Sequence, residues 1–357
     1  MNDETATVTS APTKCESKRG YSVIVPVFNG EKTLPDTLRS LFLLKYDPFE
    51  VLVVDDGSTD RSAEIARAAG ARVISLACNS GPAAARNRGA LEAAYDTLLF
   101  TDSDVLLSRG LLAELDNTFS KTQADAVQGT FSEVCPYANY FSQYKNLYNR
   151  YVLNQLPDWI DTTFTSVTAV KRDAFLQCGG FDERIRTASI EDRTLGRHLR
   201  RRGYRIFLDR GMEVIHNKRL TFAGFVRNQY RRSRDLAKFL LRSRAEKTAP
   251  AEPTVAPMDE HGRFGTNAPS TMLRIPIVYA ILPVLVLSCF LPVFGIALLP
   301  LLLSFLYLIL PFEMDLVKRR GIGFALKGIF VNFLDAIVSG WGVFTGIFEF
   351  IVCEKRY

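Results

Sequence analysis

The stretch LLFTDSD, residues 98–104, ends an apolar run with two carboxylates, Asp102 and Asp104. The apolar residues predict the end of a buried strand, and side chains at positions i and i+2 of an extended chain point the same way. Both carboxylates are therefore expected to face one space beyond the carboxyl edge of a sheet, where open α/β sheets bind ligands. Because Mg²⁺ is commonly held by one or two carboxylates plus substrate phosphates, the stretch predicts a metal–diphosphate site.

Strands and helices alternate in the segment that leads to this stretch. Apolar runs at 21–29, 51–54 and 72–76 predict three further strands, and the stretches between them have the periodicity and capping residues of helices. This alternation predicts a right-handed, mostly parallel sheet of the Rossmann-like α/β class. The run at 51–54 also ends in an acidic pair, Asp55-Asp56, at the same expected edge of the sheet.

Charge and cysteine usage narrow the classes of function. The net charge is +6, and ten Lys/Arg lie between Lys218 and Lys247 against only Asp235 and Glu246. A basic block before an apolar stretch favours an anionic membrane surface or a phosphate-bearing lipid, and no base-stacking aromatics accompany it to indicate nucleic acid. The six cysteines are scattered without a C-x-x-C pair, which is typical of reduced thiols facing the cytosol.

The C-terminal part predicts a helical membrane region. Residues 275–312 contain no charge, which predicts two spans, about 275–291 and 295–312, joined near Pro292. The loop that follows contains three consecutive basic residues from Lys318, and the positive-inside rule places it, together with the catalytic part, in the cytoplasm. Residues 322–352 are apolar but interrupted by polar groups. They predict either an interfacial helix or a third span, and a span from about Ile329 is slightly favoured.

These observations predict four regions. Residues 1–20 are a disordered tail, 21–244 form the catalytic domain, 245–271 are a proline-rich flexible linker, and 272–357 form the membrane region. The chain is therefore expected to be an integral protein of the inner or plasma membrane with its catalytic domain on the cytoplasmic side.

Five motifs, taken together, resemble those of the family-2 glycosyltransferases. They are Pro26-Val27-Phe28-Asn29, Asp55-Asp56-Gly57-Ser58-Thr59-Asp60, the Gly81 to Asn87 loop, Asp102-Ser103-Asp104, and Gly180-Phe181-Asp182 followed by Glu191-Asp192. The resemblance covers about residues 21–217. It implies the GT-A fold and a metal-dependent, inverting transfer of sugar from a nucleotide-diphosphate sugar, with a UDP-sugar favoured.

The resemblance also implies roles for the residues of the donor half of the site. Asp104 would be the Mg²⁺ or Mn²⁺ ligand, Asp102 would lie toward the ribose and the metal's waters, and His216 would complete the metal shell. The nucleotide would be bound by Pro26, Phe28, Asn29, Asp55, Asp56, Arg86 and Ser103. The alternatives are that the acidic pairs cap the following helices or turns, and that His216 is an ordinary core or surface histidine.

The acceptor half is less specific in sequence. Asp192 is the predicted general base, and Glu191 either shares the catalytic role or stabilises a helix N-terminus. Gln229 and Arg232 are placed like the Gln-x-x-Arg-Trp motif of processive synthases, but Ser233 stands where that motif has tryptophan. The motif's arginines would meet the donor diphosphate or an acceptor phosphate, or would dock on anionic headgroups.

The sequence therefore predicts a membrane-anchored glycosyltransferase that acts on a lipid or lipid-linked acceptor. Two other enzymes remain open: a polyprenyl-phosphate sugar transferase and a processive polysaccharide synthase. A non-enzymatic alternative is a membrane adaptor that keeps the fold without catalysis. Membrane lipids are expected partners, and nucleic acid is not.

Overall fold

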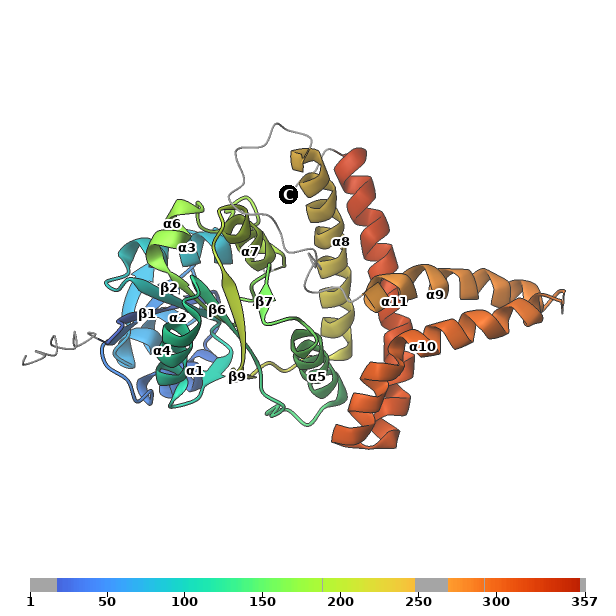
Figure 1. Cartoon of the computed structure of the whole chain (residues 1–357), viewed down its shortest axis with the longest axis horizontal. Coiled ribbons are helices and arrows are strands. Elements are labelled where there is room, and N and C mark those ends of the chain that lie inside the picture. The colour runs from blue at the N-terminus through green and yellow to red at the C-terminus, as the bar shows by residue number, and fades with distance from the viewer. Residues whose placement is uncertain (1–17, 188, 248–268, 292, 354–357) are drawn as a thin grey trace, which may run out of the picture.

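The computed structural model describes residues 18–187, 189–247, 269–291 and 293–353. Most of the predicted tail at 1–20 and linker at 245–271 lies outside these residues. The part up to His216 forms a layered α/β domain, and long helices follow it on one side (Figure 1).

One twisted sheet organises the α/β domain, in the order β3-β2-β1-β4-β8-β6-β9-β5, with β7 added beside β9. Its first half is parallel and consists of β1 (Tyr21–Val27), β2 (Phe49–Asp55), β3 (Arg72–Ser75) and β4 (Thr97–Thr101). The second half consists of β5 (Val105–Leu107), β6 (Ala126–Phe131), β7 (Trp159–Ile160), β8 (Val167–Lys171) and β9 (Ile206–His216).

The α/β fold class is confirmed, but the parallel arrangement holds only for the first half of the sheet. In the second half, β8 pairs antiparallel with both β4 and β6, β9 pairs antiparallel with β5 and β7, and β6 and β9 are parallel. Every residue of β1 is buried, as expected for a central strand covered on both faces.

Helices cover both faces of the sheet. On one face are α1 (Leu34–Phe42), α2 (Ser62–Ala68) and α4 (Leu111–Thr122). On the other are α3 (Pro82–Glu92), α6 (Arg172–Gln177) and α7 (Glu191–Arg201). Each layer of helices buries its own apolar cluster against the sheet. Because β1, β2 and β4 are neighbours and run parallel, their carboxyl ends lie at one edge of the sheet.

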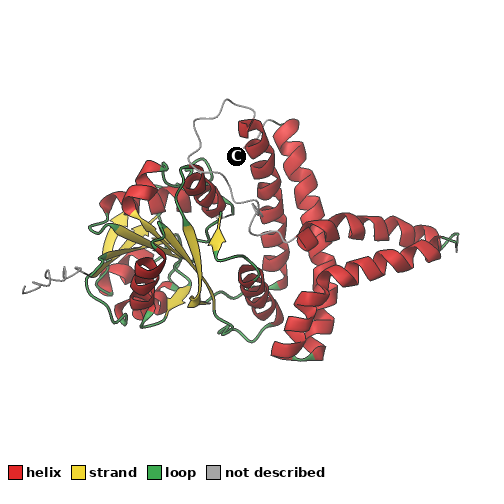
Figure 2. Ribbon diagram, viewed as in Figure 1, coloured by secondary structure: helices red, strands yellow, loops and turns green. Residues whose placement is uncertain are grey.

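The remaining helices lie to one side of the sheet (Figure 2). They are α5 (Tyr140–Asn154), α8 (Phe222–Lys247), α9 (Pro269–Ser288), α10 (Phe294–Arg320) and α11 (Ile322–Ile351). Helices α9 and α10 lie side by side and project away from the rest of the chain, while α8 and α11 run side by side across their base (Figure 1). By length and composition, α10 and α11 are candidate membrane spans, and the apolar part of α9, Leu273–Ser288, is shorter.

Candidate active site

A cavity of about 620 Å³ lies at the carboxyl edge of the sheet and extends to the C-terminal helices. Its walls come from three parts of the chain, which are far apart in sequence. The sheet edge contributes Pro26, Phe28, Asp56, Asp102, Ser103 and Asp104, helix α7 contributes Glu191 and Asp192, and helices α8, α9 and α11 contribute Gln229, Arg232, Arg274 and Asp335.

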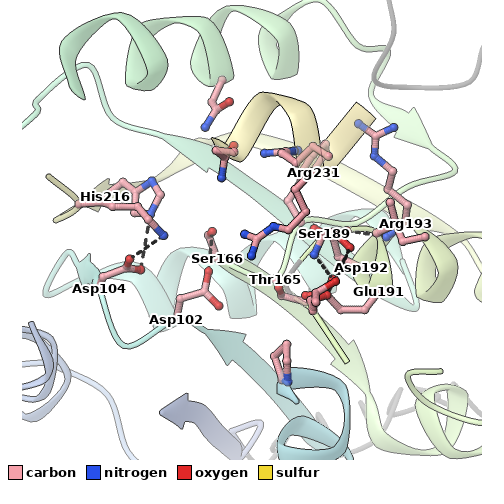
Figure 3. Close-up of a pocket in the computed structure, with 18 of the residues that line it drawn as sticks. Asp102, Asp104, Thr165, Ser166, Ser189, Glu191, Asp192, Arg193, His216 and Arg231 are labelled. Carbon is pink, nitrogen blue, oxygen red and sulfur yellow. Dashed lines mark hydrogen bonds and ion pairs between the residues drawn. The ribbon is translucent and has the colours of Figure 1, made fainter. Parts of the chain in front are cut away.

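The two carboxylates of the opening motif lie in a turn, not in an extended strand. Strand β4 ends at Thr101, and the N–H of Val105 donates to the carbonyl oxygen of Asp102 at 3.2 Å as the chain turns into β5. Both side chains still line the cavity, but they have different partners (Figure 3). The expectation that strand alternation aligns them was wrong, because the turn replaces the extended backbone on which it depends.

Asp104 lies at one end of the cavity beside an imidazole and an ammonium group. Its carboxylate oxygens are 3.5 Å from Nε2 of His216 and 3.2 Å from Nζ of Lys218. Burial alone would raise the pKa of Asp104, but its interactions with His216 and Lys218 hold this pKa well below its usual range. The His216 ring stacks on Phe131, with ring centroids 5.5 Å apart, which fixes the imidazole toward Asp104.

The donor set at this end fits a divalent cation that takes most of its ligands from a diphosphate. Asp104 supplies a carboxylate and His216 an imidazole nitrogen, both facing the cavity. Within the described ranges, no three His, Cys, Asp or Glu side chains gather as a metal-binding group. Mg²⁺ sites of one or two protein ligands completed by substrate phosphates are of this kind.

Asp102 belongs to a buried ion-pair network that spans the sheet edge and α7. Arg86, 3% exposed, donates to Oδ1 of Asp102 at 2.7 Å and to Oε1 of Glu191 at 3.1 Å. Ser166 donates to the other oxygen of Asp102 at 2.9 Å, and Glu191 also accepts from the N–H of Ser189. Arg86 therefore positions two acidic groups of the cavity wall, and the predicted contact of Arg86 with base or phosphate stays a prediction.

We expect Arg86→Met to lower the free energy of unfolding by about 3–5 kcal/mol, because Glu191 is left buried without its cation. The matched control is Arg88→Met on the same helix, whose side chain is 49% exposed and pairs with Glu92. An exposed i,i+4 pair contributes about 0.3–0.5 kcal/mol. Thermal and urea unfolding of both variants tests this, and equal losses in the two variants would contradict it.

Asp192 occupies the opposite end of the cavity from Asp104 (Figure 3). Its Oδ1 accepts from the N–H of Arg193 at 2.8 Å, and Thr163 donates to its carbonyl oxygen at 2.6 Å. Burial, together with the negative charge of Glu191, raises the pKa of Asp192 to about 7. A carboxylate with such a pKa is suited to accept a proton near neutral pH.

The acidic pair after β2 holds loops in place. Asp56 accepts the N–H groups of Ser80 and Gly81, both at 2.8 Å, and Asp55 accepts the N–H of Ser58 at 3.1 Å. Asp56 lines the cavity, whereas Asp55 is not among the lining residues. Burial raises the pKa of Asp56.

Asn29 also lies outside the cavity lining. Its backbone has a φ of 52°, and its side-chain oxygen accepts the N–H of Thr59 at 2.8 Å. This contact joins the turn after β1 to the loop after β2. Direct contacts of Asn29 and Asp55 with a nucleotide therefore stay predictions, and both side chains serve the loops that frame the cavity.

Two basic side chains that the sequence did not single out, Lys145 and Arg193, line the same part of the cavity as Arg232. Lys145, on α5, donates to Gln229 at 3.0 Å, and burial together with the charge of Arg232 lowers the pKa of Lys145 to about 7. Burial and Arg232 also lower the pKa of Arg193 to about 10. Lys145 lies within a stripe of aromatic residues on α5, so no local sequence signal marks it as part of a site.

The side chain of Gln229 belongs to a network of hydrogen bonds and ion pairs that joins α8 to α9 and α11. It donates to Asp335, which also pairs with Arg274, while Arg274 donates to Asn332. The predicted donor contact of Gln229 stays a prediction. Arg274, Asp335 and Ser339 reach the cavity through the packing of α11 against α8 and of α9 against α11.

Comparison with known proteins identifies the class. Residues 22–179 match the family described as Glycosyl transferase family 2. The matched part therefore belongs to family 2 of the glycosyltransferases, and it contains the sheet edge with Asp102 and Asp104 in a chain with the GT-A fold.

Individual relatives match shorter parts of the chain. An uncharacterized glycosyltransferase of Haemophilus influenzae is 32% identical over 116 residues, 31% of this chain and 46% of that protein. Glycosyltransferase GlyG of Streptococcus pneumoniae is 31% identical over 115 residues, 31% of this chain and 38% of that protein. The matches thus span less than half the length of these curated relatives.

A solved structure extends the fold comparison to most of the chain. The mannosyltransferase PcManGT of Pyrobaculum calidifontis, in complex with GDP-Man and Mn²⁺, aligns with a TM-score of 0.59 at 19% identity. The alignment covers 94% of this chain and 88% of PcManGT. The likeness therefore shows that the C-terminal helices, as well as the α/β domain, have a counterpart in a known fold.

Proposed function

We propose that the chain transfers a sugar from a nucleotide-diphosphate sugar to a lipid or lipid-linked acceptor at a membrane. One observation carries this proposal: a single cavity is lined by Asp104 at the sheet edge, by Asp192 on α7 and by Asp335 on an apolar C-terminal helix. A donor bound at the sheet edge and an acceptor that arrives along the C-terminal helices would meet in this space.

In the proposed reaction the donor diphosphate lies at the Asp104 end. Asp104 and His216 would hold a Mg²⁺ or Mn²⁺ ion, which when bound neutralises the charge that develops on the departing diphosphate. Lys218 adds a positive charge beside it. The mannosyltransferase with the same fold was solved with GDP-Man and Mn²⁺, which supports a nucleotide sugar and a divalent ion here.

Asp192 acts as the base in this proposal. Its carboxylate takes the proton of the acceptor hydroxyl while that oxygen attacks the anomeric carbon opposite the leaving diphosphate, and the configuration inverts. Arg86 keeps Glu191 and Asp102 in place on either side of the reacting centre.

A specific observation favours one second candidate, a polyprenyl-phosphate sugar transferase. Lys145, Arg193 and Arg232 line the cavity, and the charges of Arg193 and Arg232 act on Asp192. Glu191 pairs with Arg86, and Asp335 pairs with Arg274. A phosphate on the acceptor would compensate these cations, and its oxygen would attack without help from a base.

The proposal includes attachment to the inner or plasma membrane with the catalytic domain on the cytoplasmic side. The apolar α9–α10 hairpin projects from the body (Figure 1). It has large exposed side chains, including Phe290, Ile296 and Tyr307. Arg319 and Arg320, at the end of α10, pair with Glu133 of the catalytic part. The basic end of the hairpin and the catalytic domain therefore lie on one side, as the positive-inside rule requires for a cytoplasmic domain.

The decisive experiment incubates the purified full chain with native membrane lipids and a panel of labelled UDP- and GDP-sugars, with Mg²⁺ or Mn²⁺. The proposal predicts a labelled lipid that carries a single sugar. A labelled product without a lipid would contradict the acceptor class, and a polymer would identify a processive synthase. No product with any donor, and no metal-dependent donor hydrolysis, would favour the adaptor.

A further inference from the structure

We propose that α11 lies along the membrane surface at the level of the lipid headgroups, and that only the α9–α10 hairpin enters the hydrocarbon. This inference rests on the proposed membrane attachment and goes beyond it. By length and composition α11 qualifies as a span, and the sequence slightly favours that interpretation. The contacts of α11 with the rest of the chain oppose it.

The beginning of α11 is held by the catalytic part. Arg319 and Arg320, directly before the helix, pair with Glu133, which follows β6. Within the first turn of α11, the carbonyl oxygen of Phe324 accepts from the hydroxyl of Tyr140 on α5 at 3.3 Å. This end of α11 therefore lies on the catalytic side.

The other end of α11 is held on the same side. Glu349, near its last turn, pairs with Lys238 of α8 at 2.5 Å. That part of α8 is in turn fixed to the α/β domain, because Phe239 packs against Ile185 and Ile190. A helix that crosses a bilayer has its ends on opposite sides, and α11 has both ends on the catalytic side.

Helix α8 runs parallel to α11 in close contact. Gln229 contacts Asp335 near the start of the shared interface, and Lys238 contacts Glu349 near its end. Between these points a Cβ at Gly342 would lie only 2.5 Å from the carbonyl oxygen of Tyr230, so the backbones approach closely. The two helices must therefore take the same depth in a membrane.

The positive charge of α8 excludes this helix from the hydrocarbon core of the bilayer. Six basic side chains lie between Phe222 and Arg242, namely Arg227, Arg231, Arg232, Arg234, Lys238 and Arg242. Each Lys or Arg at the centre of a bilayer costs about 2.5–3.5 kcal/mol on insertion scales. If α11 crossed the membrane, α8 would bring these charges with it. At the headgroup level these charged groups stay outside the hydrocarbon, and the exposed Arg227 lies where it can meet anionic lipid.

The surface of α11 has two distinct faces. The face toward α8 and α10 buries small and polar residues, among them Gly328, Asn332, Asp335, Ser339 and Gly346. The opposite face exposes the large apolar side chains of Leu326, Phe330, Trp341, Phe344 and Phe348. At 100° per residue these five side chains form one stripe. Such a helix, with exposed Trp and Phe on one face, is typical of the membrane interface.

The apolar stripe on α11 is continuous with the α9–α10 hairpin. Because the hairpin is proposed to enter the bilayer, the partner of the stripe is lipid. Ile337, in the middle of α11, accepts a hydrogen bond from the hydroxyl of Tyr279 on α9, and Ile329 and Phe333 pack in the same cluster as α9 and α10. The exposed stripe thus flanks the base of the hairpin on both sides. When the hairpin enters the bilayer, this face of α11 meets its surface.

This placement brings the reaction to the headgroup level. Arg274, Asp335 and Ser339 line the cavity from the inner faces of α9 and α11. The polar head of a membrane lipid can therefore reach Asp192 while its chains stay in the bilayer.

Tryptophan depth measurements test the inference. The chain has two tryptophans, Trp159 and Trp341, so Trp159→Phe leaves Trp341 as a single reporter on α11. In the Trp159→Phe, Trp341→Phe background, Phe330→Trp and Phe348→Trp place reporters 18 residues apart, about 27 Å along the helix axis. Tyr307→Trp, 76% exposed on α10, is the reporter for the hairpin. Each variant is reconstituted into vesicles that contain lipids brominated at a shallow or a deep acyl position.

We expect the three α11 reporters to have the same shallow depth, with stronger quenching by shallow bromines, and Tyr307→Trp to be quenched most by deep bromines. Depths that change by about 20 Å or more from position 330 to 348 would show a span and overturn the inference. Absence of quenching at all three, with deep quenching at 307, would show that α11 lies outside the membrane and would also overturn it. Absence of quenching at 307 as well would refute the membrane attachment itself.

Discussion

Replacement of Asp104 by asparagine should lower the rate of sugar transfer by about a thousandfold, a loss of about 4 kcal/mol of transition-state stabilisation. The carboxylate is the anionic group of the Asp104–His216 pair that faces the cavity. Asparagine keeps the size of the side chain but removes the charge that would attract a divalent ion. Initial rates with saturating donor and a titration of Mn²⁺ measure the effect.

The matched control for Asp104 is Asp173→Asn, which changes an exposed aspartate on α6 and should leave the rate within about twofold. Thermal unfolding of both variants separates lost chemistry from lost fold. Removal of metal with a chelator should abolish transfer by the unaltered chain, and added Mn²⁺ or Mg²⁺ should restore it. A rate of sugar transfer for Asp104→Asn within about threefold of the rate of the unaltered chain would contradict the proposed role of Asp104.

The second large effect concerns Asp192. If the acceptor is a hydroxyl, Asp192→Asn should lower kcat/KM by about 10²–10⁴-fold, the usual contribution of a general base. The base works only when ionised, and burial together with Glu191 raises the pKa of Asp192 to about 7. For the unaltered chain, kcat/KM should therefore fall as the pH decreases through about 7, and this limb should be absent in the variant.

The same variant separates the two candidate acceptors. A phosphate acceptor needs little help from a base, so a polyprenyl-phosphate transferase would keep substantial activity with Asp192→Asn. Asp158→Asn is the control, since Asp158 is exposed and pairs with Arg210 outside the cavity. A large decrease in kcat/KM, together with loss of the fall in kcat/KM at low pH, supports the hydroxyl acceptor. A small loss supports the phosphate acceptor.

The donor half of the site could be predicted because its residues follow the ends of strands. Asp56 and Asp102 come directly after β2 and β4, and the carboxyl ends of parallel strands meet at one edge. Their individual contacts could not be predicted in this way. Whether a carboxylate faces a ligand or caps a loop depends on the neighbouring turn, and Asp55 and Asp56 take different places although they are adjacent.

The polar contacts at the far end of the cavity could not be predicted at all. Lys145 and Arg274 are 129 positions apart, and only the packing of α5, α8, α9 and α11 brings them to the same space. Neither residue belongs to a motif, because a contact across a tertiary interface leaves no periodicity within one segment.

By itself, the sequence determined the class of the fold and the succession of the first strands along the chain. It also determined the carboxylates at the sheet edge and the apolar character of the C-terminal part. These features are local, since apolar periodicity and turn residues act within a few positions of the chain. The tertiary structure decided which carboxylates face the cavity, which cations surround Asp192, and how α11 is held. For α11, an apolar composition is compatible with both a span and an interfacial helix, and only the contacts at its two ends distinguish them.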